Sequence, residues 1–211
     1  MSYDYDELAD CVIAGDEERA AKLTQKAIDA GADPVEIITQ GLTGGMSVVG
    51  ARFKSGEMFV PEVLASARAM SVGTELAKPL ILAGDMPSAG TVVIGTVKGD
   101  LHDIGKNLVA MLLESAGFTV VNVGTDIEPA AFVQAVKESD ADVLGLSALL
   151  TTTMLSMKAT IDALAEAGLR DKVKVVIGGA PVTQEFASEI GADGFAYDGG
   201  AAIDLCNGLM A

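Results

Sequence analysis

The chain has 211 residues, half of them apolar, a length that suits one large or two small domains with well-filled cores. Its formal net charge of -16 at pH 7 repels phosphate backbones and anionic lipid, which argues against nucleic acid or a membrane surface as a partner. The N-terminus shows no secretory signal, no apolar stretch is long enough to span a bilayer, and the two distant cysteines fit a reducing compartment. We therefore expect a cytoplasmic protein.

Residues 3–82 carry apolar side chains at spacings of three and four and show no alternating strand pattern, which predicts helices. Breaks between these helices fall at Gly15, at Asp33-Pro34 and between residues 53 and 61. Asp33 suits an N-cap and Pro34 the first position of the helix that follows. Four helices of this length predict a helical bundle.

Residues 84–90 contain the glycine and proline turn formers of a linker, and the periodicity changes there from helical to strand-like. We expect a helical-bundle cap domain over residues 1–87 and an α/β domain over residues 88–211. Short apolar runs alternate with helical patterns in the second part, which implies a buried parallel sheet with helices on both faces. The predicted strands cover residues 91–97, 119–123, 143–147, 173–177 and 194–197, and the predicted helices cover residues 104–116, 128–138, 153–167, 183–190 and 201–210.

The expected fold class is thus a four-helix bundle followed by a flavodoxin- or Rossmann-like five-stranded parallel sheet. In such a sheet the ligand lies beyond the carboxyl ends of the strands, near the point where the strand order reverses. The loops after strands one and three would flank that point. The segments that follow strand ends are residues 98–106, Ser147, Gly178-Gly179 and Asp198-Gly199-Gly200.

The loop at residues 98–107 holds His102, the only histidine of the chain. Asp100 lies two residues earlier, so on an extended loop both side chains leave the same side and the carboxylate can fix one imidazole nitrogen. Such a carboxylate orients a metal ligand. A bare zinc or iron ion needs three or four protein ligands, yet Cys11 and Cys206 stand alone near opposite ends. One histidine suffices only where the metal brings its own equatorial ligands, as in a tetrapyrrole-type macrocycle.

Three motifs occur in order after predicted strands: Asp100-x-His102-x-x-Gly105, Ser147-x-Leu149 and Gly178-Gly179. Together they resemble the signature of the cobalamin-binding domains of methionine synthase and the corrinoid methyl-carrier proteins. The resemblance extends to residues 53–68, which look like the helical cap of that family, and it covers nearly the whole chain. It implies a cobalamin cofactor, as methylcobalamin or cob(I)alamin, with His102 as the lower axial ligand of cobalt in place of the cofactor's benzimidazole.

The resemblance also implies roles for further residues. Phe53 and Val60 would shield the upper face of the cobalt, although some relatives carry a larger leucine at the second position. Ser147 and residues 151–153 would offer hydroxyl partners to the cofactor's tail or to Asp100, and Ser147 would act on the imidazole through Asp100. The displaced benzimidazole would lie beside Gly105, Ser147 and Gly178. With His102 as the metal ligand, the expected cofactor-binding residues are Phe53, Val60, Gly99, Asp100, Leu101, His102, Asp103, Ile104, Gly105, Ser147, Leu149, Thr151, Gly178, Gly179, Asp198, Gly199 and Gly200.

Each of these features also has a structural explanation. Gly178-Gly179 can form a strand-to-helix turn, and Asp100 can cap the helix that follows it, although Asp103 is the better cap. Phe53 and Val60 can belong to the core of the bundle.

By this resemblance the chain would carry a methyl group between two methyltransferases. One would take the methyl group from a methylamine, betaine, methanol or a methyl ether, and the other would pass it to tetrahydrofolate or a thiol coenzyme. A reductive activase would be a further partner, and residues 84–90 would be the hinge that lets the cap swing away. The carrier supplies no substrate pocket of its own, so its status as an enzyme stays open.

Three other functions match parts of the sequence. A Ser147-His102-Asp100 hydrolase is disfavoured because the segment around Ser147 lacks the second glycine of a Gly-x-Ser-x-Gly elbow. A P-loop is disfavoured because residues 99–106 are one residue too long and are followed by Asn107. A cobalamin-binding sensor stays open as an alternative, although this acidic chain has no room for a basic DNA-binding module.

Overall fold

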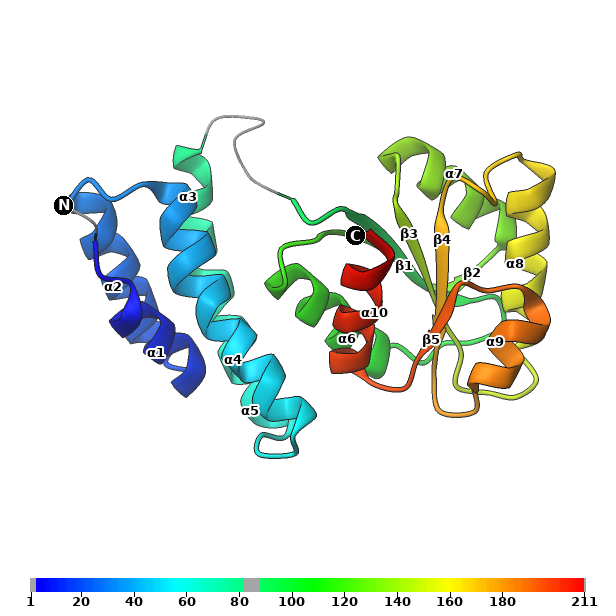
Figure 1. Ribbon diagram of the computed structural model, residues 1–211, viewed down its shortest axis with the longest axis horizontal. Helices are drawn as coiled ribbons and strands as arrows, with labels where there is room; N and C mark the ends of the chain where they lie inside the picture. The colour runs from blue at the N-terminus through cyan, green and yellow to red at the C-terminus, as the bar shows by residue number, and fades with distance from the viewer. Residues whose placement is uncertain (1–2, 82–87, 211) are drawn as a thin grey trace. The chain divides into compact units, whose positions relative to one another are not determined.

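A computed structural model describes residues 3–81 and 88–210 (Figure 1). Apart from residues 115–117, the described residues separate into two compact units, one within residues 3–81 and the other within residues 88–210. Of the predicted hinge at residues 84–90, residues 84–87 lie outside the described part. The hinge and the domain boundary therefore stay predictions.

The first unit is helical. Its helices are α1 (Asp6–Ala14), α2 (Glu17–Asp29), α3 (Pro34–Glu36), α4 (Thr43–Lys54) and α5 (Val60–Ala77), with a π-helical segment η1 (Ile37–Leu42) between α3 and α4 and a 3-10 turn η2 (Lys78–Leu80) after α5. The Asp33 carboxylate accepts a hydrogen bond from the Val35 N–H, and Pro34 occupies the first turn of α3, as its sequence position predicts. The glycine-rich third helix is thus one helical run with a π-helical turn inside it.

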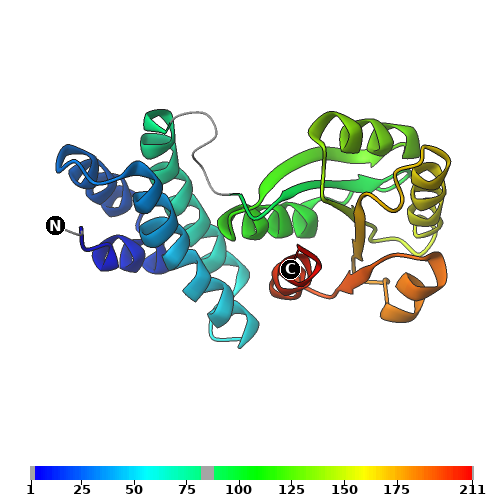
Figure 2. The ribbon, with the colours of Figure 1, turned by 45° about the horizontal axis from the view of Figure 1, so that its top comes forward.

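The second unit is a five-stranded parallel sheet with the order β2-β1-β3-β4-β5. Its strands are β1 (Thr91–Val97), β2 (Thr119–Ile127), β3 (Val143–Ser147), β4 (Lys174–Gly178) and β5 (Gly194–Ala196). The helices are α6 (Ile104–Ser115), α7 (Pro129–Ser139), α8 (Leu155–Glu166), α9 (Gln184–Ile190) and α10 (Gly199–Met210). Helices α6 and α10 cover one face of the sheet, and α7, α8 and α9 cover the other (Figures 1 and 2). The expected doubly covered, flavodoxin-like sheet is confirmed.

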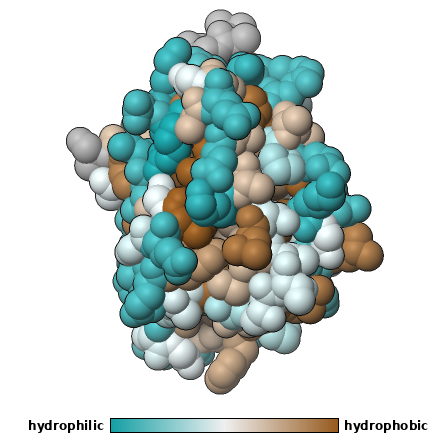
Figure 3. Space-filling view, turned by 90° about the vertical axis from the view of Figure 1, so that its right-hand side faces the viewer, coloured by the Kyte–Doolittle hydropathy of each residue, from teal (hydrophilic) through white to brown (hydrophobic). Residues whose placement is uncertain are grey.

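Apolar strand residues build the core of this unit. Val93, Leu144 and Ile177, from three adjacent strands, are buried together with Phe132 of α7. The side of the unit formed by α8 and α9 is mostly hydrophilic, with hydrophobic residues in small separate patches (Figure 3). No helix within residues 3–81 and 88–210 is both long enough and apolar enough to cross a membrane.

The observed strands differ from the predicted ones chiefly at β2. We expected this strand to end at Val123, before Gly124, but it continues to Ile127. Its pairing with β1 shifts register twice, once between Ile94 and Gly95 and again between Gly95 and Val97. Such irregularities let a strand bend while it remains in the sheet. They carry the end of β2 to the loop that follows β1.

Candidate functional site

The loop between β1 and α6 forms the centre of the candidate site. It lies at the carboxyl end of β1, beside the place where the strand order reverses between β1 and β3. Gly99 has a φ of +82°, a left-handed conformation that favours glycine, and it turns the chain at the start of the loop. At its other end, the Thr96 hydroxyl donates a hydrogen bond of 2.9 Å to the His102 carbonyl oxygen. The loop is therefore fixed to its own strand.

The carboxylate of Asp100 is buried and accepts hydrogen bonds from two segments of the chain. Its Oδ1 accepts from the His102 N–H at 3.1 Å and lies 2.7 Å from His102 Nδ1. Its Oδ2 accepts from the N–H groups of Leu149 and Leu150, at 2.8 and 3.1 Å, and from the Thr153 hydroxyl at 2.7 Å. The structure thus brings Asp100 and His102 together, as their spacing suggested, and joins them to the loop after β3.

These contacts determine the charge of Asp100. Burial by itself raises the pKa of this carboxyl, but the hydrogen bonds from His102, Thr153 and Leu149 outweigh it and hold the pKa well below its usual value. The carboxylate is therefore ionised near neutral pH and can only accept hydrogen bonds. Consequently the proton of a neutral imidazole lies on Nδ1, and the lone pair lies on Nε2.

His102 presents that lone pair outward. Its side chain is 51% exposed. Within residues 3–81 and 88–210, Nε2 has no hydrogen-bond partner and no group of three or more His, Cys, Asp or Glu side chains could hold a metal ion. A single outward imidazole fits a metal that arrives with its other ligands.

The hydroxyl that reaches Asp100 belongs to Thr153, and the expectation that Ser147 would act through Asp100 is wrong. Ser147 ends β3, where it pairs with Thr96 and Gly178 in the sheet. After β3 the chain turns back, so that two backbone N–H groups and the Thr153 hydroxyl converge on the carboxylate. Among the described residues no hydroxyl bonds the imidazole either, so a Ser-His-Asp triad is not formed. The run of three threonines was a signal for this contact, but it did not identify the residue.

The glycines of the motifs divide into two kinds. A Cβ atom on Gly179 would lie 1.8 Å from the Ala148 carbonyl oxygen, and one on Gly199 would lie 2.3 Å from Leu112 Cδ1. Packing within the chain therefore explains both, and a Cβ on Gly178 would also be close to the Ala196 carbonyl oxygen, at 3.0 Å. A Cβ on Gly105 would meet no atom within 4 Å. Only at Gly105 among these four does the open space leave room for a ligand.

The other expected residues surround the histidine loop or end a strand. Leu101 and Ile104 are 73% and 82% exposed, and Leu149 is also exposed. Large apolar side chains so exposed at one loop suit contact with an apolar ligand. By contrast, Asp198 has a structural role, since its Oδ1 accepts the Ala201 N–H at 2.7 Å at the start of α10.

For three further residues of the expected cofactor-binding set, the structure gives a position but no contact that points to a ligand. Asp103 Oδ2 accepts a hydrogen bond of 2.9 Å from the Asn107 side-chain amide in the first turn of α6. Thr151 is exposed in the turn before α8, and Gly200 is buried at the start of α10.

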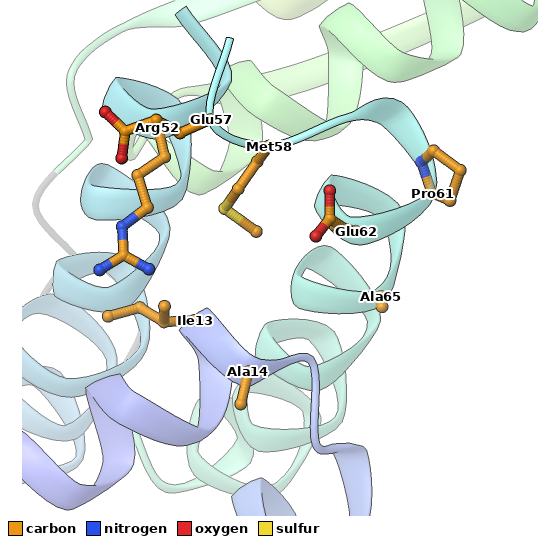
Figure 4. Close-up of a pocket in the computed structure, with 8 residues that line it drawn as sticks. All are labelled: Ile13, Ala14, Arg52, Glu57, Met58, Pro61, Glu62 and Ala65. Atoms are coloured by element: carbon orange, nitrogen blue, oxygen red, sulfur yellow. The ribbon is translucent and has the colours of Figure 1, made fainter. Parts of the chain in front are cut away.

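Phe53 and Val60 lie in the helical unit. Phe53 is half-buried in the last turn of α4, and Val60 is the first residue of α5 and is exposed. This unit contains a cavity of about 500 Å³, lined by Ile13, Ala14, Arg52, Glu57, Met58, Pro61, Glu62 and Ala65 (Figure 4). Neither Phe53 nor Val60 lines it. The Glu62 carboxylate already accepts the Phe59 N–H at the start of α5, so the cavity does not by itself indicate a ligand.

Comparisons with known proteins agree with this geometry. A family described as a B12 binding domain matches residues 90–205, and a second family with the same description matches residues 5–78. A corrinoid protein of Desulfitobacterium hafniense (strain Y51) is 46% identical over 97% of this chain and 96% of its own length. The chain belongs to the B12-binding corrinoid proteins. The predicted family and its cofactor, cobalamin, are thereby confirmed.

Further relatives match nearly the whole length of the chain and support the same family assignment. Trimethylamine corrinoid protein 1 of Methanosarcina acetivorans is 46% identical over 96% of this chain and 93% of its own. The crystal structure of the methanol:cobalamin methyltransferase complex MtaBC from Methanosarcina barkeri matches with a TM-score of 0.88 and 35% identity, over 97% of this chain and 78% of that one. A cobalamin-binding protein from Desulfitobacterium hafniense DCB-2 matches with a TM-score of 0.78 and 32% identity, over 98% of both chains.

Proposed function

We propose that this corrinoid protein binds cobalamin with His102 as the lower axial ligand of cobalt and carries a methyl group between two methyltransferases. The observation that carries the proposal is a solitary imidazole with Nδ1 bonded to a buried carboxylate and Nε2 directed outward. A macrocycle that holds its metal on four sides needs only one such donor. When bound, cobalamin supplies a cobalt centre that accepts and releases a methyl group.

The residues around His102 would orient the imidazole and receive the cofactor. Asp100 holds the proton on Nδ1 and fixes the plane of the ring, while Thr153 and the backbone N–H groups of the loop after β3 keep the carboxylate ionised. Leu101 and Ile104 would contact the macrocycle. Gly105, where no side chain fills the space, would leave room for the cofactor's nucleotide tail.

Further roles for Ser147, Gly178, Phe53 and Val60 are proposed from the family resemblance. Ser147 and Gly178 would lie beside the nucleotide tail at the strand ends. Phe53 and Val60 would shield the upper face of the cobalt, and residues 84–90 would serve as the hinge that moves them away.

The relatives support a methyltransferase as the first partner. One relative of known structure comes from the methanol:cobalamin methyltransferase complex MtaBC. Relatives by sequence include trimethylamine and dimethylamine corrinoid proteins. A methylamine or methanol would therefore be the methyl donor. A second methyltransferase that uses tetrahydrofolate or a thiol coenzyme, a reductive activase, and a cytoplasmic location complete the proposal.

Reconstitution with hydroxocobalamin tests the cofactor part of the proposal. We expect one cobalamin to be retained per chain, with an absorption spectrum that shows histidine in place of benzimidazole on cobalt. The loaded protein would then be reduced and offered methanol, dimethylamine or trimethylamine with the methyltransferase specific for each. Transfer from one donor class supports the carrier function. Retention of cobalamin without transfer from any donor would favour the sensor alternative, and no retention would refute both.

A further inference from the structure

We propose that Asp126, which lies outside the expected cofactor-binding set, is a positioning residue that fixes Asp100 and through it the imidazole of His102. The inference deepens the proposed function and rests on the role of His102 as axial ligand. It starts from an irregularity of the sheet. Strand β2 continues past Gly124 to Ile127 while its register with β1 shifts twice, and Asp126 lies in this extension.

Asp126 makes two hydrogen bonds to the histidine loop. Its backbone N–H donates to the Asp100 carbonyl oxygen at 3.0 Å. Its Oδ1 accepts from the Gly99 N–H at 2.7 Å. The side chain and the backbone of this one residue therefore hold the N–H of Gly99 and the carbonyl of Asp100, respectively. The dipeptide between these two groups cannot rotate freely, which sets the direction in which the Asp100 side chain leaves the loop.

The conformation of Asp126 indicates that this contact is specific. Its φ is +56°, and among the described residues only Asp140 shares a positive φ without being glycine. The left-handed region disfavours residues with a Cβ atom, although aspartate and asparagine tolerate it better than most. Asp126 is exposed on the edge strand, so burial of its side chain does not explain the conformation. The two hydrogen bonds to the loop do.

The strand that carries Asp126 is itself held by α6. The buried Lys106 Nζ donates to Asn122 Oδ1 at 2.6 Å, and the same oxygen accepts the Gly124 N–H at 3.1 Å. Lys106 Nζ also donates to the Asn107 side chain at 2.6 Å. Asn122 thus anchors the first irregularity of β2 to the helix that follows the histidine loop. These contacts hold the segment of β2 that carries Asp126 in place.

The test uses the fact that His102 is the only histidine, so its ring nitrogens give the only imidazole signals in a nitrogen-15 NMR spectrum of the apoprotein. We would compare the wild type with Asp126→Gly, Asp126→Ala and Asp126→Asn at about pH 9, where an ordinary imidazole is neutral. Glycine keeps the backbone N–H, tolerates the left-handed conformation and removes the side chain with its carboxylate. Asparagine keeps an acceptor at Oδ1 and tolerates the backbone conformation. Asp140→Gly is the matched control, because it changes the other left-handed aspartate, at the end of α7.

We expect wild type, Asp126→Asn and Asp140→Gly to hold the proton on Nδ1. Asp126→Gly and Asp126→Ala should raise the share of the Nε2–H tautomer about two- to tenfold, the range that one lost hydrogen bond allows. Thermal unfolding and backbone amide spectra would establish that each variant is folded. After addition of hydroxocobalamin, the same two variants should show a smaller share of histidine-ligated cobalt.

An unchanged tautomer in folded Asp126→Gly and Asp126→Ala would overturn the inference. The same shift in Asp140→Gly would also overturn it, because the effect would then not depend on the histidine loop. Loss of the Nδ1–H tautomer in Asp126→Asn would do so as well, since the acceptor is retained there. Failure of every protein, wild type included, to bind cobalamin would instead refute the proposed function and leave the tautomer result valid.

Discussion

The Nδ1 atom of His102 lies 2.7 Å from a carboxylate oxygen of Asp100 that is buried and ionised, while the opposite edge of the imidazole is open to solvent. A carboxylate so placed makes one nitrogen a donor and leaves the other as a ligand. The site therefore needs no further protein ligand to present one nitrogen to a metal.

Replacing His102 by alanine should leave the fold intact, because the side chain is half exposed and the His102 N–H still bonds Asp100. Cobalamin should be bound more weakly, or with its own benzimidazole on cobalt. Absorption spectra and retained cobalamin per chain, measured after reconstitution with hydroxocobalamin, check this. Lys98→Ala, which removes the exposed ion pair between Lys98 of the same loop and Glu128 at the start of α7, is the control. Identical spectra for His102→Ala and wild type would argue against axial ligation.

Removing the hydroxyl of Thr153 should destabilise the apoprotein. Thr153→Ala takes one hydrogen bond from a buried carboxylate, and we expect the free energy of unfolding to fall by about 1–3 kcal/mol. Thr153→Ser should recover most of this loss, and the exposed Thr152→Ala should change little. Urea denaturation of wild type, these three variants and Ser147→Ala measures the differences. If Ser147→Ala cost more than Thr153→Ala, the assignment of the hydroxyl partner would be wrong.

The stability of the apoprotein should depend on the charge of Asp100 in acid. Because its pKa in the folded protein is held below the ordinary value of 3.8, the ionised carboxylate stabilises the fold above that pH, and the contribution is lost as the pH falls through the folded pKa. The difference in unfolding free energy between wild type and Asp100→Asn should therefore shrink from about pH 5 to about pH 2. Denaturant titrations at each pH check it. The exposed Asp171→Asn has the same change of charge, and its difference from wild type should not follow this course.

Two glycine substitutions should distinguish a glycine that contacts the cofactor from a glycine that packing within the chain requires. Gly105→Ala adds a methyl group in open space in the first turn of α6, so the apoprotein should keep its stability or gain up to about 1 kcal/mol, while cobalamin affinity falls. Gly179→Ala places a Cβ against the Ala148 carbonyl oxygen at a φ of +129° and should destabilise the apoprotein by at least about 2 kcal/mol. Unfolding curves and cobalamin titrations distinguish the two. Unaltered cobalamin affinity in Gly105→Ala would remove the glycine from the proposed tail contacts.

Truncation of Phe53 should expose the upper face of bound methylcobalamin. Phe53→Ala, and to a smaller degree Val60→Ala, should speed loss of the methyl group in light, followed by the change in visible absorption. Leu80→Ala, a truncation of an exposed apolar residue elsewhere in the helical unit, is the control. Equal photolysis rates in all four proteins, wild type included, would contradict the shielding role.

Much of the fold could be predicted because periodicity reports burial directly. The bounds of β1 and β3 are those expected, since both strands are short apolar runs between clear breaks. β2 was predicted too short because Gly124 interrupts the pattern, whereas in the sheet it belongs to a bend that Asn122 and Lys106 stabilise. Those contacts join residues far apart in sequence, and periodicity carries no signal for them.

The site was predictable to the extent that its motif is local. Asp100 and His102 are two residues apart, and their contact follows from that spacing. The Thr153 contact depends on how the loop after β3 turns back, and the Asp126 contact depends on the bend of β2. Gly179 and Gly199 were interpreted as cofactor contacts, yet packing inside the chain already requires both.

Two of the donors that hold the second oxygen of Asp100 are main-chain amides, those of Leu149 and Leu150. Exchange of these leucines for other side chains leaves the amides in place, but an insertion or deletion between Ser147 and Thr153 displaces them together. The contact with Asp100 therefore constrains the length of this stretch during divergence and does not depend on its side chains at residues 149 and 150. An engineer who grafts the histidine loop onto another parallel sheet would have to transplant the crossover after the third strand with it.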